Sequence, residues 1–152
     1  MKKILFLFML VLCCACQEDK SIDPTLMPQA TATGENTLGC LIDGWVYTSP
    51  RFGSPTVTIG KDEKNNYVRI SARVGIHASL HFVLVNPQQG VTCVYTHAVF
   101  DNRDLGEGEA HITRMDGKVI SGTFSGEGIT EGRFDIRYSQ GTEEGGGEYC
   151  FP

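Results

Sequence analysis

The fold is decided by the stretch NYVRISARVGIHASLHFVL, residues 66–84, in which apolar and polar side chains alternate on both sides of a glycine. Before Gly75 the even positions, 68 to 74, are apolar, and after it the even positions from 78 to 84 are apolar again. A repeat of two residues is typical of a strand with one buried face. The stretch therefore predicts two strands joined by a turn at Gly75.

The parity of these two strands also predicts how they pair. A hairpin keeps its apolar side chains on one face only if paired residues have the same parity. A two-residue turn would break this rule, whereas a three-residue loop, 75–77, pairs Val74 with Ala78 and Ile70 with Phe82. We predict the three-residue loop.

The same rule predicts a second hairpin around Ile112 and Ile120. A three-residue loop that ends on Gly117 would pair these two isoleucines, and Arg114 with Lys118. Glycine suits the last loop position because it adopts left-handed backbone angles freely.

Further alternation predicts more strands. They cover residues 40–47, 56–60, 91–100 and 133–138, and Asp43 and Gly44 are expected to form a turn inside or beside the first of these. Eighteen glycines in 152 residues argue against long helices. We expect one all-β domain over residues 37–152, an antiparallel β-sandwich or small β-barrel of about seven to nine short strands.

The amino terminus is typical of a secretory signal. Residues 1–15 combine a short basic start with an apolar stretch of twelve residues, which is too short to span a bilayer. The sequence LCCAC that ends on Cys16 resembles a bacterial lipobox. The resemblance implies that the thiol of Cys16 receives a diacylglycerol, that cleavage precedes it and that the new amine is acylated. Cys14 is the alternative acceptor, although it would place Cys13 at the small-residue position.

The residues after Cys16 predict where the protein resides. Residues 17–20, QEDK, are similar to the export signal of surface lipoproteins of Bacteroidota; the alternative is an ordinary solvated tether. Residues 16–36 read as a lipidated, flexible linker. We expect an outer-membrane protein held by its lipid, exposed on the cell surface if the export signal operates.

The charge balance excludes one class of partner. Removal of fifteen residues leaves 152 − 15 = 137, and the charge becomes 11 − 18 = −7. An acidic domain favours solubility and speaks against nucleic-acid binding, which needs a basic surface.

Two parts of the sequence resemble a family. Residues 33–46, TGENTLGCLIDGWV, with ISGTF at 120–124 and EGRFDI at 131–136, are similar to small Bacteroidota lipoproteins that carry a domain of unknown function. Those chains typically read Thr-Gly-x-Asn-Thr-Phe-Gly-Cys-Leu-Val-Asn-Gly in the first block, so that Leu38 replaces an aromatic residue here. The resemblance implies an all-β fold and assigns no activity, catalytic residues or cofactor.

Export also permits disulfides. Two of the six cysteines leave with the signal and Cys16 carries lipid, so Cys40, Cys93 and Cys150 allow three pairings. Because Cys40 belongs to the family-like block, we expect Cys93 to pair with Cys150.

Two groups of residues are candidate ligand contacts. Trp45 and Tyr47, with Phe52 and Tyr95, would form an aromatic platform for a sugar or a peptide, although aromatic side chains in strands more often pack in a core.

A second group is basic. The alternation places Arg69, Arg73 and His81 on the outer face of the first hairpin, with His81 opposite Ser71. The alternative interpretation is an ordinary solvated sheet face. His77 and His81 lie about 13 Å apart on a strand, too far to share a metal ion.

A weak calcium site is a further candidate. Asp101, Asp104 and Glu107 lie in a glycine-bearing segment that we expect to be a loop, and calcium prefers oxygen ligands. Arg103 and Leu105 occupy positions where an EF-hand needs oxygen, so the alternative is an exposed turn. No cofactor is expected.

No enzyme motif is present. The chain has no nucleophile elbow, no His-Glu-x-x-His and no phosphate-binding glycine loop. We therefore expect no enzymatic activity, with a hydrolase as the alternative. The expected function is a non-catalytic envelope module that binds a glycan or a protein, and the alternative is a structural subunit of an outer-membrane or surface complex.

The lipobox makes a prediction of its own. Mass spectrometry of the protein from bacterial membranes should find the chain starting at Cys16 with fatty acyl mass added. Cys16→Ser should leave the unprocessed precursor, since its side chain is no acceptor thiol. An unmodified precursor in soluble extract of the wild type would contradict the prediction.

Overall fold

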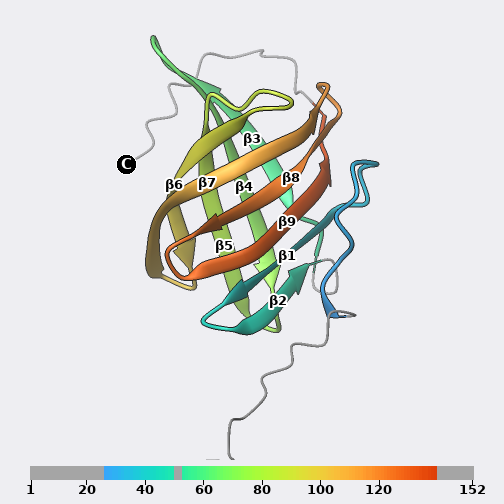
Figure 1. Cartoon of the computed structure of the whole chain (residues 1–152), viewed down its shortest axis with the longest axis vertical. Helices are drawn as coiled ribbons and strands as arrows, with labels where there is room; N and C mark the ends of the chain where they lie inside the picture. Colours follow the sequence, from blue (N-terminus) through green and yellow to red (C-terminus); the bar gives the residue numbers. More distant parts are fainter. Residues whose placement is uncertain (1–25, 50–52, 140–152) are drawn as a thin grey trace, which may run out of the picture.

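The protein is all-β. The structure, a computed structural model, describes residues 26–49 and 53–139, and this part of the chain folds into nine antiparallel strands of one sheet (Figure 1). The strands are β1 (Thr37–Ile42), β2 (Trp45–Ser49), β3 (Thr56–Lys61), β4 (Asn66–Val74), β5 (Ala78–Val85), β6 (Thr92–Phe100), β7 (Arg103–Met115), β8 (Val119–Gly126) and β9 (Ile129–Arg137). No helix within these residues is long and apolar enough to cross a membrane.

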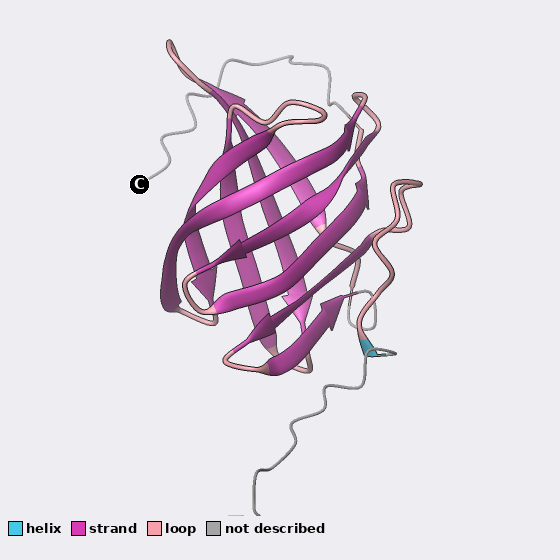
Figure 2. Ribbon diagram, in the orientation of Figure 1, coloured by secondary structure: helices cyan, strands magenta, loops and turns pink. Residues whose placement is uncertain are grey.

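The strand order makes the sheet a meander with one hairpin added. The order is β2-β1-β9-β8-β7-β6-β5-β4-β3, so β3 to β9 are neighbours in sequence and the β1–β2 hairpin lies beside β9. The sheet curls until β2 approaches β4, where the backbone N–H of Gly75 donates to the carbonyl oxygen of Thr48 at 3.4 Å. Figure 2 shows the resulting half-barrel, which is a single curled sheet instead of two packed sheets.

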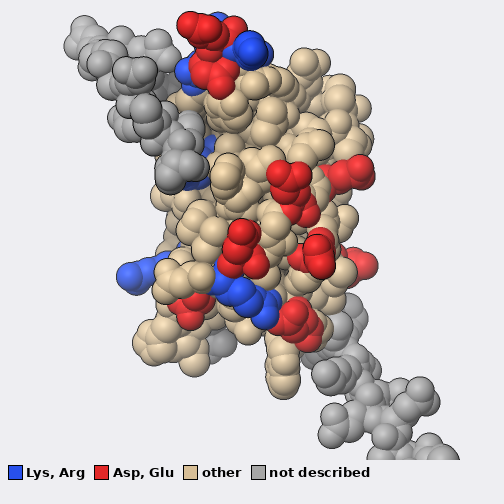
Figure 3. Space-filling model, turned by 90° about the vertical axis from the view of Figure 1, so that its left-hand side faces the viewer, with Lys and Arg blue, Asp and Glu red and all other residues tan. Residues whose placement is uncertain are grey.

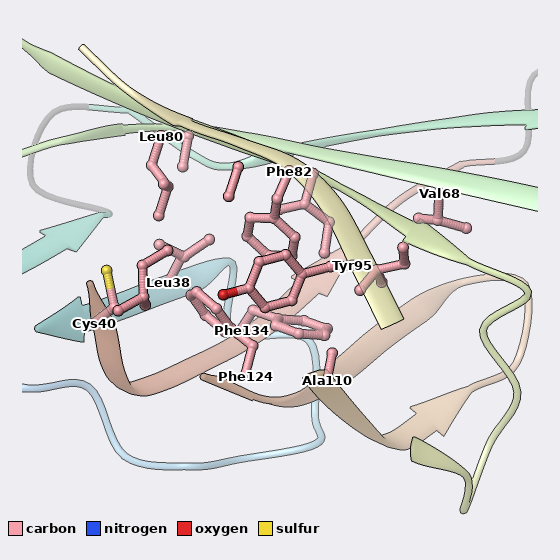
Figure 4. Close-up of a cluster of buried hydrophobic side chains, with 14 of the residues drawn as sticks. Leu38, Cys40, Val68, Leu80, Phe82, Tyr95, Ala110, Phe124 and Phe134 are labelled. Atoms are coloured by element: carbon pink, nitrogen blue, oxygen red, sulfur yellow. The ribbon is translucent and has the colours of Figure 1, made fainter. Parts of the chain in front are cut away.

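The concave face of the sheet holds the core. Phe82 stacks on Phe124 with ring centroids 4.7 Å apart, and Tyr95 and Phe134 complete an aromatic group (Figure 4). These rings come from β5, β6, β8 and β9, and each is buried. Because aromatic side chains bury large areas, this group joins strands on opposite sides of the curl.

The Tyr95 ring reaches far enough to need two glycines. A Cβ atom at Gly108 or Gly126 would overlap the Tyr95 hydroxyl group. That hydroxyl is buried and has no hydrogen-bond partner among the described residues. Burial, followed by the nearby Cys40, raises the pKa of Tyr95 to about 12.

The first hairpin has the predicted register. Val74 pairs with Ala78 and Ile70 with Phe82, around a loop of residues 75–77. Parity was sufficient here because both strands bury one continuous apolar face.

The predicted register of the second hairpin is wrong. Neither predicted pair forms: Met115, and not Ile112, lies opposite Ile120. A bulge follows Ile112. The Asp116 carboxylate accepts hydrogen bonds from the backbone N–H groups of Lys118, at 3.0 Å, and Val119, at 2.9 Å. The bulge changes the parity, so both isoleucines stay buried in a different register.

The predicted turn at Asp43 and Gly44 is confirmed, and it divides residues 40–47 into the β1–β2 hairpin. Asp43 and Gly44 both have positive φ, at 52° and 79°, as a two-residue turn with the sheet's twist requires. One local prediction is wrong. The segment expected to be a glycine-rich loop is mostly strand: Asp104 and Glu107 belong to β7, and Asp101 lies in the turn before it.

The buried Tyr95 hydroxyl yields a stability prediction. Tyr95→Phe should raise the free energy of unfolding by about 1 kcal/mol, since it removes a buried polar group that lacks a partner. Chemical denaturation measures the change. Tyr67→Phe is the matched control, because the Tyr67 hydroxyl donates to Asp62 at 2.7 Å and its loss should not stabilise the protein. Destabilisation by Tyr95→Phe would contradict the prediction.

Candidate functional site

Residues 27–36, the strap, cover part of the outer face of the half-barrel. Under the strap lies Asp135, which points outward from β9 and is still only 1% exposed. The strap falls within the segment 16–36 predicted as a linker, of which residues 16–25 lie outside the described residues.

The Asp135 carboxylate accepts five hydrogen bonds, four of them from the strap. The donors are Thr31 Oγ1 (2.6 Å), Thr33 N (3.0 Å), Gly34 N (2.8 Å), Glu35 N (3.1 Å) and Ser121 Oγ (2.6 Å). Successive backbone N–H groups that converge on one anion form a nest, which suits a carboxylate as well as a ligand. The strap is therefore wrapped around a charge that belongs to the barrel.

The hydrogen bonds decide the ionisation of this carboxyl group. Burial alone would raise the pKa of Asp135, but the bonds from Ser121, Thr31 and the strap N–H groups lower it from 3.8 to about 2. Asp135 is consequently ionised at neutral pH.

Other contacts hold the strap along its length. Arg114 Nη1 donates to the carbonyl oxygen of Ala32 at 2.6 Å, and Arg133 Nη1 donates to that of Pro28 at 3.1 Å. Hydrogen bonds from residues 33–35 to Asp135 thus join two of the family-like segments, 33–46 and 131–136. These bonds hold the fold together.

A polar groove of about 460 Å³ opens on the outer face beside the strap. Its lining includes Ala30 of the strap, Phe124 and Gly132, and these polar side chains of β6 to β9: Thr92, Glu109, His111, Thr123, Ser125, Glu131 and Arg133.

The strand register orders these side chains into rows. Thr92, His111, Thr123 and Arg133 are cross-strand neighbours on β6, β7, β8 and β9. Side chains that are directly opposite lie about 5 Å apart. Hydroxyl, imidazole and guanidinium groups therefore follow one another across four strands.

A second row adds an acceptor. Glu109 pairs with Ser125, and each of them is two residues along its strand from a member of the first row. Arg133 is oriented by its bond to the strap and has Glu131 Oε2 at 3.7 Å. The groove therefore offers donors and acceptors in fixed positions, and suits a ligand with many hydroxyl groups.

The predicted aromatic platform does not form. Tyr95 is buried in the core, and Tyr47 packs edge-on against Phe100 with ring centroids 4.7 Å apart. Trp45 alone is exposed, at the start of β2, and Phe52 lies outside the described residues.

Arg69, Arg73 and His81 do share the outer face of β4 and β5, and His81 pairs with Ser71 as predicted. Burial, then the charge of Arg69, lowers the pKa of His81. These residues lie on other strands than those of the groove.

Two of the cysteines lie within the described residues. Cys40 and Cys93 are buried thiols. Burial raises the pKa of Cys40 to about 12, and burial also raises the pKa of Cys93 above its ordinary value. Cys16 and Cys150 lie outside the described residues, so the pairing of Cys93 with Cys150 stays a prediction.

Within the described ranges no group of three or more His, Cys, Asp or Glu side chains is placed to hold a metal ion.

Sequence reasoning missed the groove. Its residues alternate with buried ones along β7 and β8, which is a visible signal for an outer face. The cross-strand rows, however, depend on a register that includes bulges, and the groove also includes Ala30 of the strap; neither feature follows from parity. Comparison with protein-family models, curated proteins and solved structures gives no match.

The Asp135 carboxylate makes a testable contribution to stability. Asp135→Asn should lower the free energy of unfolding at pH 7 by about 2 to 3 kcal/mol, because an amide cannot accept all five bonds. Since the folded-state pKa is lowered, the stabilisation is present above about pH 4 and is lost as the pH falls toward 2. Denaturation at several pH values should show a flatter profile for the variant. Equal pH profiles of the unfolding free energy in the wild type and Asp135→Asn would contradict this role. Asp104→Asn, at an exposed position of β7, is the control.

Proposed function

We propose that this protein is an exported envelope protein, anchored to the bacterial outer membrane by lipid on Cys16, whose domain is a non-catalytic binding module. The lipobox and the family-like blocks support the anchor and a place among small Bacteroidota lipoproteins. We propose further that the polar groove binds a hydroxyl-rich ligand of the glycan type.

The observation that carries the binding proposal is the row of polar side chains across β6 to β9. The row stands on four hydrogen-bonded strands, which hold side chains more precisely than loops do. The volume of the groove, about 460 Å³, lies within the range of small-ligand sites.

The chemistry of the groove favours a neutral ligand. Glu109 and Glu131 provide two carboxylates against the single guanidinium of Arg133. An anionic ligand would meet repulsion in a domain that is acidic overall. Sugar hydroxyl groups can both donate to the carboxylates and accept from Arg133.

A second function is supported by the edge of the sheet. Among the described strands, β3 pairs with β4 on one side only and ends the strand order. A free strand edge can pair with a strand of another chain, which is how an assembly subunit would dock.

Glycan binding is tested with the mature domain on an array of neutral oligosaccharides, followed by calorimetry. Glu109→Gln and Thr123→Val should each weaken binding about tenfold, which corresponds to about 1.4 kcal/mol for each lost hydrogen bond. Glu63→Gln, in the exposed turn between β3 and β4, is the matched control and should bind normally. No glycan bound, or equal losses in all three variants, would refute the groove; a crosslink from β3 to an envelope protein would favour the assembly subunit.

A further inference from the structure

Two large hydrophobic side chains are exposed at one end of the half-barrel. Trp45 is 67% exposed and Ile76 is 73% exposed. Ile76 follows Gly75, whose N–H donates to Thr48 of β2, and Tyr47 has its ring 3.4 Å from the position of a Cβ on Gly75. The turn between β4 and β5 therefore lies beside β2, at the end of the half-barrel where β2 also begins (Figure 1).

These side chains do not complete the core. Trp45 pairs with Ile42, which is buried, whereas the side chain of Trp45 itself is exposed. Single exposed apolar residues are ordinary on a protein surface. Two at the same end of the half-barrel, with the highest exposed fractions among the large hydrophobic residues described, indicate a surface that meets an apolar partner.

The chain toward Cys16 departs from this same end. The strap begins beside Leu26, which is 60% exposed, and Figure 1 shows this start in blue at the end where the β1–β2 and β4–β5 turns lie. Nine residues separate Leu26 from Cys16. At no more than about 3.5 Å per residue, they hold this end within about 35 Å of a lipid on Cys16.

We infer that this end of the half-barrel rests on the bilayer, with the side chains of Trp45 and Ile76 inserted among the lipid headgroups. The inference rests on the proposed lipid anchor and goes beyond it, because a tether alone leaves the domain free to turn. Indole prefers the membrane interface, where its ring is buried and its N–H stays hydrated.

The charges near this end predict that the contact is apolar. Asp43 and Arg103 form an ion pair at 2.7 Å, and Asp101 in the neighbouring turn is exposed. β7 also exposes Asp104 and Glu107, and Figure 3 shows several acidic side chains on the face that it views. Because carboxylates would be repelled by anionic lipid, the contact should be made by the apolar side chains with neutral lipid and should be insensitive to salt.

The contact would orient the groove. The groove lies on the outer face of β6 to β9, along the side of the half-barrel, and stays open to solvent when the end of the barrel meets the membrane. The opposite end, with the turns at 62–65 and 116–118, points away from the bilayer.

Trp45 is the single tryptophan of the chain, so its fluorescence reports on this end alone. The lipidated full chain is reconstituted into phosphatidylcholine vesicles, with and without bromine on the acyl chains. Brominated lipid should quench the emission of Trp45 by at least half. Ile76→Glu, a change at an exposed side chain, should reduce that quenching at least twofold.

A matched control moves the probe. In Trp45→Phe with Val94→Trp the tryptophan is on β6, where Val94 is 48% exposed, and brominated lipid should not quench it. Equal quenching in both proteins would overturn the orientation.

The remaining outcomes separate the anchor from the orientation. Lipidated protein that floats with vesicles while Trp45 stays unquenched overturns the inference and leaves the anchor standing. Protein isolated from the bacterial membrane that carries no lipid on Cys16 overturns the anchor and, with it, the inference. Trp45 that is shielded from aqueous quencher in soluble, lipid-free protein, increasingly with concentration, means that a second copy covers this end, and this too overturns the inference.

Discussion

A carboxylate buried on the outer face of a sheet needs a full set of hydrogen-bond donors, and Asp135 obtains four of its five from the strap. Without them an ionised side chain would be sealed from water at a cost of several kcal/mol. The charge therefore holds residues 31–35 against β9 and β8. Two further features follow: the strap forms one wall of the polar groove, and the chain leaves the barrel at a defined end.

The curl of the sheet explains why the two proposed contacts do not compete. The core occupies the concave face, where rings from β5, β6, β8 and β9 meet, so polar side chains of the same strands point outward. The groove uses that outer face. The exposed side chains of Trp45 and Ile76 belong instead to one end of the sheet, at the start of β2 and in the turn between β4 and β5.

Particular residues show how far the fold could be predicted. The register from Ile70 to Phe82 followed from parity, because both strands bury one uninterrupted face. The register at Ile120 did not, because a bulge and the Asp116 side chain changed the loop. Glycines and acidic residues made β7 resemble a loop, although the glycine at 108 is there because the ring of Tyr95 leaves no room for a Cβ.

The sequence by itself determined the all-β class and the strands of the first hairpin, since alternation depends only on neighbours along the chain. It also determined the expectation of a lipid on Cys16, which a local motif carries. Only the tertiary structure decided that Thr33 and Gly34 bind Asp135, that four strands line up one polar row, and that Trp45 and Ile76 lie at the same end of the half-barrel. Each of these three arrangements joins segments that are far apart in sequence. The curl of the sheet and its bulges decide which of these segments meet in space.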